Sequence, residues 1–223
     1  LPSSSSSNFS SPPPPPLPAP TNHVSISRQF GEVKGIWVID PRIIAPALFL
    51  PPLLPDEGED FRRNLYIKSH HGAITVEVTL VPSEGDGLSS GRAAIVLEAG
   101  TVNGAVNGTM VRLPTKIKLS GCNGAIYVRI PRSFRGLVNA GYLWGSLRLS
   151  DEVRSRVRYT KEEQQMIRLF IGEPDEAQFS CDTWAGDEVN VHTKHGSVFI
   201  GYDDEMEPEG KGVLSRLWGS VFS

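Results

Sequence analysis

A short unit that recurs along the chain constrains the fold more than any other feature of this sequence. Each copy has an apolar residue, a four-residue corner, a glycine, a small residue and then alternating aliphatic residues. Clear copies join Ile67 to residues 72–76, Leu119 to residues 124–128 and Val191 to residues 196–200. Alternation of period two buries one face of a strand, and glycine accepts the backbone of a sharp corner. The unit therefore predicts a strand that turns a corner and continues.

The spacing of the corner glycines predicts how the units are arranged. Gly104 lies 20 residues before Gly124, which lies 21 residues before Gly145. This spacing fits one turn of a stacked repeat, in which each turn buries its apolar face against its neighbours. We expect an all-β, single-stranded β-solenoid, similar to a β-helix, of about five to seven coils of ~20 residues. A β-sandwich with glycine turns is the alternative. Six corner glycines are expected to be structural: Gly35, Gly72, Gly104, Gly124, Gly145 and Gly196.

Two segments interrupt the repeat. Residues 43–54 are apolar and rich in proline, which disfavours a regular strand or helix, so we expect them to cover the N-terminal coil. Residues 151–171 contain a weakly alternating stretch and an apolar stretch, with a polar turn between them. A hairpin is the preferred interpretation there, and a helix over residues 151–166 stays open.

Composition divides the chain into three parts. Residues 1–22 form a Ser/Pro-rich arm that cannot bury a core and is expected to be disordered. Residues 23–202 form the predicted β-solenoid domain, whose charges balance. Residues 203–223 are an acidic linker followed by a short amphipathic segment, and they carry the whole net charge of −3. This balance argues against non-specific nucleic-acid binding. The absence of a signal-peptide pattern and of a long apolar run favours a cytoplasmic location.

The amphipathic C-terminal segment is the clearest candidate for partner binding. Its large apolar residues recur on one helical face, and so short a helix is not stable alone in water. It is therefore expected to cap the last coil, to enter a partner's groove or, less favourably, to contact a membrane surface. Its candidate binding residues are Leu214, Leu217, Trp218 and Phe222. The proline tract at residues 12–18 also resembles a ligand for aromatic-lined grooves of partner proteins.

Catalytic motifs are not evident. The sequence contains neither a nucleophile elbow nor a Walker-type phosphate loop, so no catalytic, cofactor-binding or metal-ligating residue is assigned and no cofactor is expected. His70, His71, His192 and His195 are interpreted as solvent-facing corner residues, with His71, Trp144 and His195 at the same position of their units. Cys122 and Cys181 are expected to be reduced, although a disulfide stays open.

Several blocks carry a family resemblance. They are residues 36–41, residues 63–65, residues 131–136 and the Trp184–Val198 region. Over residues 23–202 the chain resembles adhesin-type β-solenoid domains and, more narrowly, an uncharacterised fungal domain family of unknown function. The resemblance implies a β-solenoid and no assigned activity.

These observations favour a non-enzymatic binding or scaffold protein whose arms recruit a protein partner. Two alternatives remain. One is a carbohydrate-active enzyme on a β-helix scaffold, for which Glu77, Glu98, Arg129 and Arg148 would supply charged groups on exposed strand faces. The other is a peripheral membrane protein anchored by the C-terminal segment. The oligomeric state is not predicted.

Overall fold

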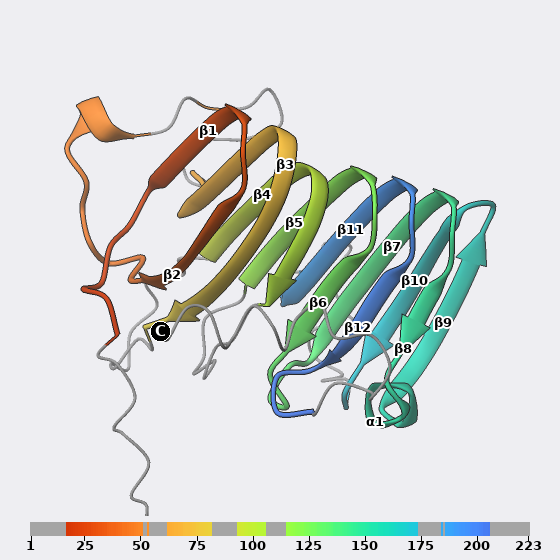
Figure 1. Ribbon diagram of the computed structural model, residues 1–223. Helices are drawn as coiled ribbons and strands as arrows, with labels where there is room; N and C mark the ends of the chain where they lie inside the picture. The colour runs from red at the N-terminus through yellow and green to blue at the C-terminus, as the bar shows by residue number, and fades with distance from the viewer. Residues whose placement is uncertain are drawn as a thin grey trace, which may run out of the picture.

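The computed structural model describes residues 17–50, 53, 62–81, 93–105, 115–173, 184 and 186–205, and the side chains of all of these except residues 99–105. This part of the chain is almost entirely β-structure (Figure 1). Its first strands are β1 (Val24–Phe30), β2 (Val33–Ile39), β3 (Leu65–Leu80), β4 (Ala93–Ala105), β5 (Thr115–Asn123) and β6 (Ile126–Ile130). The later strands are β7 (Gly136–Trp144), β8 (Leu147–Leu149), β9 (Val157–Glu163), β10 (Met166–Ile171), β11 (Asp187–His195) and β12 (Val198–Tyr202). A 3-10 turn, η1 (Ala47–Phe49), and a short helix, α1 (Asp151–Ser155), complete it.

The strands form two sheets. The larger, nine-stranded sheet has the order β1-β3-β4-β5-β11-β7-β10-β9, and β2 pairs with the second half of the long strand β3. The smaller sheet has the order β6-β12-β8, with parallel pairing throughout. In the larger sheet the pairing is parallel except at its last two steps, where β10 runs antiparallel to β7 and β9 antiparallel to β10.

The all-β prediction is confirmed, but the single-stranded β-solenoid is wrong. Successive coils of a solenoid would stack in sequence order, whereas here β11 lies between β5 and β7, and β12 lies between β6 and β8. The antiparallel strands β9 and β10 also end the larger sheet in a way that no coil repeat provides. The glycine-containing units are therefore strands of a mixed sheet and of a small parallel sheet, and they do not form five to seven successive coils.

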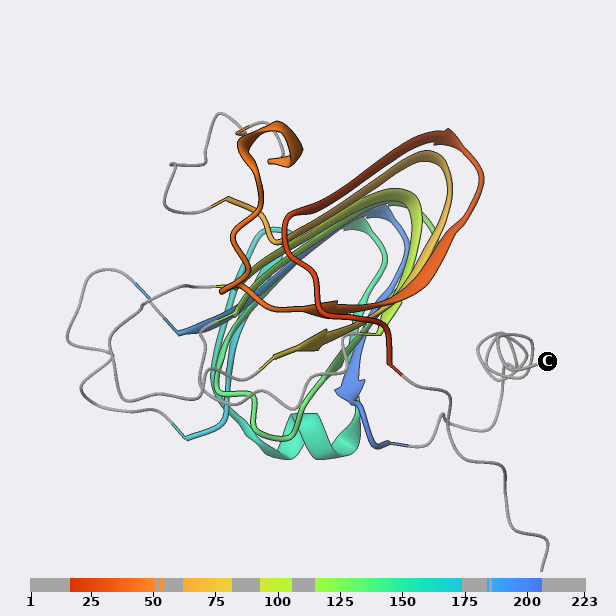
Figure 2. The ribbon, with the colours of Figure 1, turned by 90° about the vertical axis from the view of Figure 1, so that its left-hand side faces the viewer.

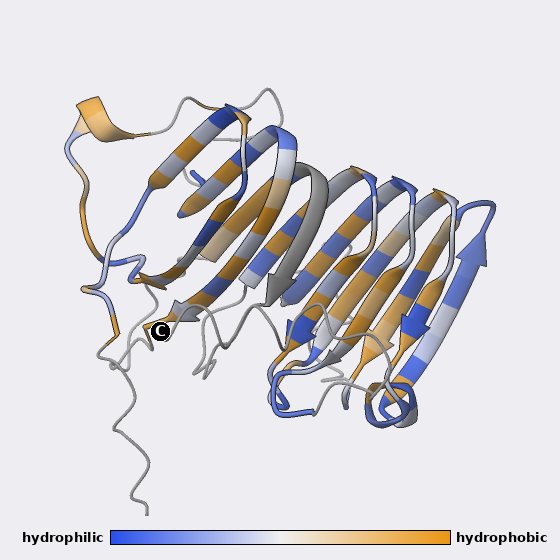
Figure 3. Ribbon diagram, in the orientation of Figure 1, coloured by the Kyte–Doolittle hydropathy of each residue, from blue (hydrophilic) through white to orange (hydrophobic). Residues whose placement is uncertain are grey.

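The core lies between the two sheets. Viewed along the direction in which the strands stack, the chain traces lie over one another and enclose it (Figure 2). In the central strands, β5 and β11 among them, alternate residues are buried, and Figure 3 shows the matching alternation of hydropathy. Ile117 and Leu119 of β5 and Val189 of β11 belong to the same buried cluster as Ile126 and Val198 of the smaller sheet. The period-two pattern in the sequence thus identified the faces that this core buries.

Of the two segments that interrupt the repeat, one has the predicted structure and the other does not. Residues 157–171 form the predicted hairpin, β9 and β10, closed by a two-residue loop in which Gln164 has a φ of 54°. The helix alternative reduces to the five residues of α1. The segment around η1 does not cover the end of the sheet as expected, because Ile44 is 94% exposed and Leu48 is 88% exposed.

Two of the blocks that carry the family resemblance have structural roles. Asn64 donates to the side chain of Asn22 (2.7 Å) and accepts from the backbone of Ala94 (2.7 Å). It thereby connects the N-terminal segment to β4. Trp184 donates to the backbone oxygen of Asp187 (2.8 Å), and the Asp187 carboxylate accepts from the backbone of Thr115 (3.0 Å). This pair of bonds fixes the start of β11 beside β5.

Candidate functional site

Three of the predicted glycines stack where the larger sheet turns into the smaller one. A Cβ at Gly145 would lie 1.8 Å from the backbone oxygen of Gly196, and a Cβ at Gly196 would lie 1.8 Å from that of Gly124. Gly124 has a φ of 98°, which favours glycine. The backbone N–H groups of Gly124 and Gly196 donate to the oxygens of His195 and Trp144, each at 2.9 Å. The backbones of neighbouring bends approach one another so closely here that there is no room for a side chain.

The other three glycines lie inside strands. Gly35 of β2 lies beneath the ring of Trp37, and a Cβ at Gly72 of β3 would lie 2.1 Å from the backbone oxygen of Gly31. Gly104 lies in β4. The predicted partner-binding residues Leu214, Leu217, Trp218 and Phe222 lie outside the described residues, as do Cys181 and the proline tract at residues 12–16.

A groove of about 580 Å³ lies on the outer face of the larger sheet, across β3, β4, β5 and β11. One row of its lining follows the strand register, since Lys68 pairs with Glu98, Glu98 with Ser120 and Ser120 with His192. A second row lies at the bends of the strands and consists of His70, His71, Cys122, Asn123 and Lys194.

Aromatic side chains flank the groove on both sides. Phe30 of β1 stacks on His71 with ring centroids 5.2 Å apart, and 72% of Phe30 is exposed. On the other side His195 opposes both Asn123 and Trp144, and Trp144 is 69% exposed. Five strand steps separate Phe30 from Trp144, or ~24 Å at the usual spacing. The two aromatic residues therefore lie on the strands next to the groove at its two ends, β1 beside β3 and β7 beside β11.

The groove contains more basic than acidic residues. Its basic lining residues are Lys68, Lys194, His70, His71 and His192, whereas Glu98 is the one acidic residue among those that line it. Lys68 forms an ion pair with Glu98 (3.4 Å), and the Tyr66 hydroxyl donates to the same carboxylate (3.2 Å). Burial, together with the negative charge of Glu98, raises the pKa of Tyr66 above its usual value. Tyr66 thus remains a neutral donor that holds Glu98 in place.

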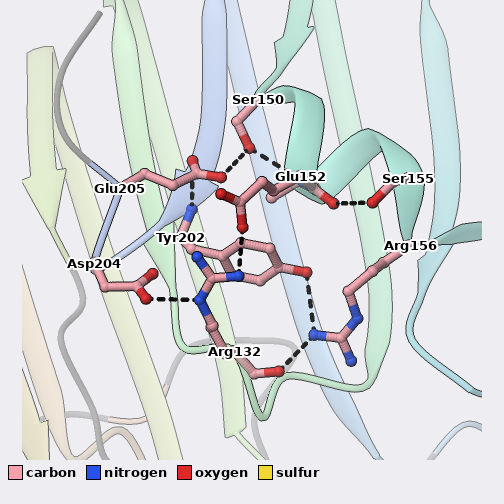
Figure 4. Close-up of polar contacts among 9 residues, drawn as sticks. Arg132, Ser150, Glu152, Ser155, Arg156, Tyr202, Asp204 and Glu205 are labelled. Carbon is pink, nitrogen blue, oxygen red and sulfur yellow. Dashed lines mark hydrogen bonds and ion pairs between the residues drawn. The ribbon is translucent and has the colours of Figure 1, made fainter.

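A polar cluster closes the far end of the molecule around α1 (Figure 4). Arg132 donates to Glu152 and to Asp204 (2.6 Å) and lies over the ring of Tyr202. The hydrogen bond from Arg132 lowers the pKa of Asp204. In contrast, burial, with the neighbouring charge of Asp204, raises the pKa of Asp203. These contacts join the β6–β7 connection, α1 and the end of β12, so the cluster is structural.

The described part of the chain contains neither a cluster of possible metal ligands nor a helix that could span a membrane. Its His, Cys, Asp and Glu side chains form no group of three or more that could hold a metal ion. None of its helices is long and apolar enough to cross a bilayer. Cys122 is a free, exposed thiol at the rim of the groove.

Sequence reasoning located some residues of this surface but not the groove itself. His71, Trp144 and His195 were placed at equivalent positions, and the register confirms that His195 and Trp144 are neighbours. Lys68 and Ser120 were missed, because nothing in a single sequence shows that β3, β4, β5 and β11 lie side by side. Polar pairs before two of the corner glycines, His70-His71 before Gly72 and Lys194-His195 before Gly196, were the available signal.

The fold and the groove define an all-β domain with an elongated polar groove on one sheet face. The chain belongs to the family described as "Domain of unknown function (DUF7330)", whose pattern matches residues 22–205. It is also similar to the crystal structure of a "putative cell adhesion protein" from Clostridium sporogenes ATCC 15579. That likeness has 12% identity and a TM-score of 0.40, and it covers 82% of this chain and 94% of the other. No curated protein matches the chain. The fungal origin stays a prediction.

Proposed function

We propose that this domain is a non-enzymatic binding module that holds a carbohydrate chain in the groove. The observation that carries the proposal is a groove of about 580 Å³ that is lined by polar groups from four strands and flanked by Phe30 and Trp144. Its volume lies within the usual range of ligand sites, ~300–1,000 Å³. Sugar hydroxyls need both donors and acceptors, which Ser120, Asn123 and Glu98 supply. Exposed aromatic faces offer apolar platforms for the C–H faces of sugar rings.

The position of the groove argues against a peptide that adds a strand. Such a peptide needs a free sheet edge. The strands beneath the groove, β3, β4, β5 and β11, each have a neighbour on both sides. A ligand of the groove therefore contacts side chains rather than unpaired backbone, as an oligosaccharide does.

The acidic residues of the groove favour binding over glycoside hydrolysis. Hydrolysis generally requires two carboxyl groups across the scissile bond, ~5–10 Å apart. Among the lining residues Glu98 is the one carboxylate, and Lys68 and Tyr66 already engage it. We therefore interpret Glu98 as an organising residue of a binding surface.

A glycan array probed with the full chain tests this function. Wild-type protein is expected to retain a defined group of glycans, and Phe30→Ala or Trp144→Ala to weaken that retention several-fold. Tyr159→Ala is the matched control, because Tyr159 is 59% exposed but lies on β9, away from the groove. An array without retained glycans, or equal loss in all three variants, would contradict the proposal. Release of reducing sugar from a retained glycan would contradict the non-enzymatic part.

A protein partner is the second candidate, and the apolar segment that follows β2 in the sequence favours it. Ile44, Leu48 and Phe49 are exposed there by 94%, 88% and 69%. The arms at residues 1–22 and 203–223 stay predicted recruiting segments, and the cytoplasmic location also stays a prediction. Pull-downs with the intact chain and with residues 23–202 separate these contributions. Partners lost on truncation require the arms, and partners lost in Leu48→Ser require the apolar segment.

A further inference from the structure

We infer that the carbohydrate held by the groove is acidic, with a carboxylate or sulfate group bound beside Lys194 and His192. This inference rests on the proposed function and adds the chemical class of the ligand. Five lining residues are lysines or histidines, against the single acid Glu98. Residues 23–202 hold 20 lysines and arginines and 20 acids, of which the groove contributes two lysines and one acid, so 18 basic and 19 acidic residues remain outside it. The excess of one lysine, with three histidines beside it, is therefore local to this surface.

The existing contacts show which cation is available to a ligand. Glu98 is shared by Lys68 and Tyr66, so the charge of Lys68 is already compensated. None of the ion pairs among the described residues involves Lys194, which is exposed at the bend of β11. An anion that binds here consequently does not have to displace a carboxylate of the protein.

The neighbours of Lys194 supply the remaining hydrogen-bond donors. His192 precedes it by two residues and has the same outward orientation, because Val191 and Thr193 on either side of His192 are buried. Ser120 opposes His192, and Asn123 lies one strand away at the bend. The Lys194 ammonium group, the His192 imidazole and the Ser120 hydroxyl thus line one part of the groove, with Asn123 at the bend. Hydrogen bonds to an ionised acceptor are about twice as strong as neutral ones, so an anion gains most from this arrangement.

Two probes with the same sugar rings, one with ionised carboxylates and one with neutral methyl esters, test the inference. Tetragalacturonate and its methyl ester have the same sugar rings, but the ester carries no negative charge. By titration calorimetry on the full chain at low salt, the acid is expected to bind at least about tenfold more tightly than the ester. Raising the salt concentration from 50 to 500 mM is expected to weaken binding of the acid and to leave the ester unchanged.

Variants assign the effect to the groove. Lys194→Gln is expected to reduce affinity for tetragalacturonate about tenfold, whereas Lys194→Arg, which retains the charge, keeps most of it. His192→Asn supplies an independent variant in the same part of the groove. Lys161→Gln on β9 is the control, since it makes the same change in net charge outside the groove. Unchanged thermal unfolding temperatures of the four variants establish that each is folded.

The outcomes separate this inference from the proposed function. Equal affinity for the acid and the ester, or retention of neutral glycans alone on the array, overturns the acidic class and leaves carbohydrate binding in place. Equal loss in Lys194→Gln and Lys161→Gln also overturns it, because the attraction would then come from the net charge. An array without retained glycans overturns both proposals.

Discussion

The two ends of the larger sheet are built in opposite ways. At one end, β9 presents Arg158, Lys161 and other charged residues along its exposed edge, and α1 with the Arg132 cluster covers the core. At the other end, β1 and β2 form the outermost layer, with Trp37 only partly buried and the segment around η1 exposed. The contrast is visible in Figure 3, where β9 is hydrophilic and η1 hydrophobic.

This difference shows how an open sheet can be protected on one side only. Charged residues on an edge strand disfavour pairing with another chain, and an antiparallel hairpin ends the parallel stack. The β1 strand has a single charged residue, Arg28, which donates to the backbone of Glu32. The protected end is therefore expected to tolerate few changes, and the exposed end many. Four predictions test that comparison.

The largest effect on the free energy of unfolding is expected for a glycine substitution. The comparison is between Gly196, in the interior of the larger sheet, and Gly31, at its exposed end. A Cβ at Gly196 would lie 1.8 Å from the backbone oxygen of Gly124, so Gly196→Ala must displace the backbone of the neighbouring bend. We expect a loss of about 3 kcal/mol or more in the free energy of unfolding. At Gly31, with a φ of 94°, nothing lies within 4 Å. Gly31→Ala is expected to cost about 1 kcal/mol, from backbone strain alone.

Urea unfolding followed by circular dichroism measures both glycine variants. Equal losses for Gly196→Ala and Gly31→Ala would show that the close approach at the bend relaxes easily. The view that this column of glycines is required for the turn between the sheets would then be wrong.

An aliphatic residue at each end provides the second comparison. Val153 of α1 is completely buried, whereas Ile44 is 94% exposed. Val153→Ala removes two buried methyl groups and leaves a space, with an expected cost of about 2 kcal/mol. Ile44→Ala is expected to change stability by less than about 0.5 kcal/mol. Thermal unfolding at several protein concentrations is the measurement. A concentration-dependent destabilisation in Ile44→Ala would reveal that this segment is covered by another chain.

Much of this architecture followed from the sequence, and the rest required contacts that a single sequence does not encode. Alternation identified buried positions such as Leu119 and Val191, and the polar turn near Gln164 predicted the hairpin. The strand order did not follow, because apolar strand faces of similar composition can pair in several orders. Nothing local indicates that β11 inserts between β5 and β7. The groove escaped prediction for the same reason, since it exists only once that order is known.

A smaller effect is expected at the N-cap of α1. The Ser150 hydroxyl accepts from the backbone of Val153 (3.1 Å) and donates to Glu205 (2.8 Å). Ser150→Ala is therefore expected to reduce stability by about 1 kcal/mol. Ser155→Ala is the matched control, since that exposed hydroxyl contacts only the last turn of the same helix. If both serine variants unfold alike, the cap does not hold the protected end together.

The smallest effect on stability is expected when a surface ion pair is removed. The pH dependence of the unfolding temperature then distinguishes the two ends. Arg132 lowers the pKa of Asp204 below its ordinary value of 3.8, so this pair stabilises the fold above that pH. The stabilisation is lost as the pH falls through the folded-state pKa, which lies below 3.8. We therefore expect Arg132→Met to lower the unfolding temperature at pH 6 and to approach wild type between about pH 4 and pH 2. Lys34→Met at the exposed end breaks one pair, with Glu32 (3.0 Å), whereas Arg132 contacts two carboxylates. Its effect at pH 6 is consequently expected to be smaller. A deficit in Arg132→Met that persists undiminished at pH 2 would instead assign the role of Arg132 to its packing on the ring of Tyr202.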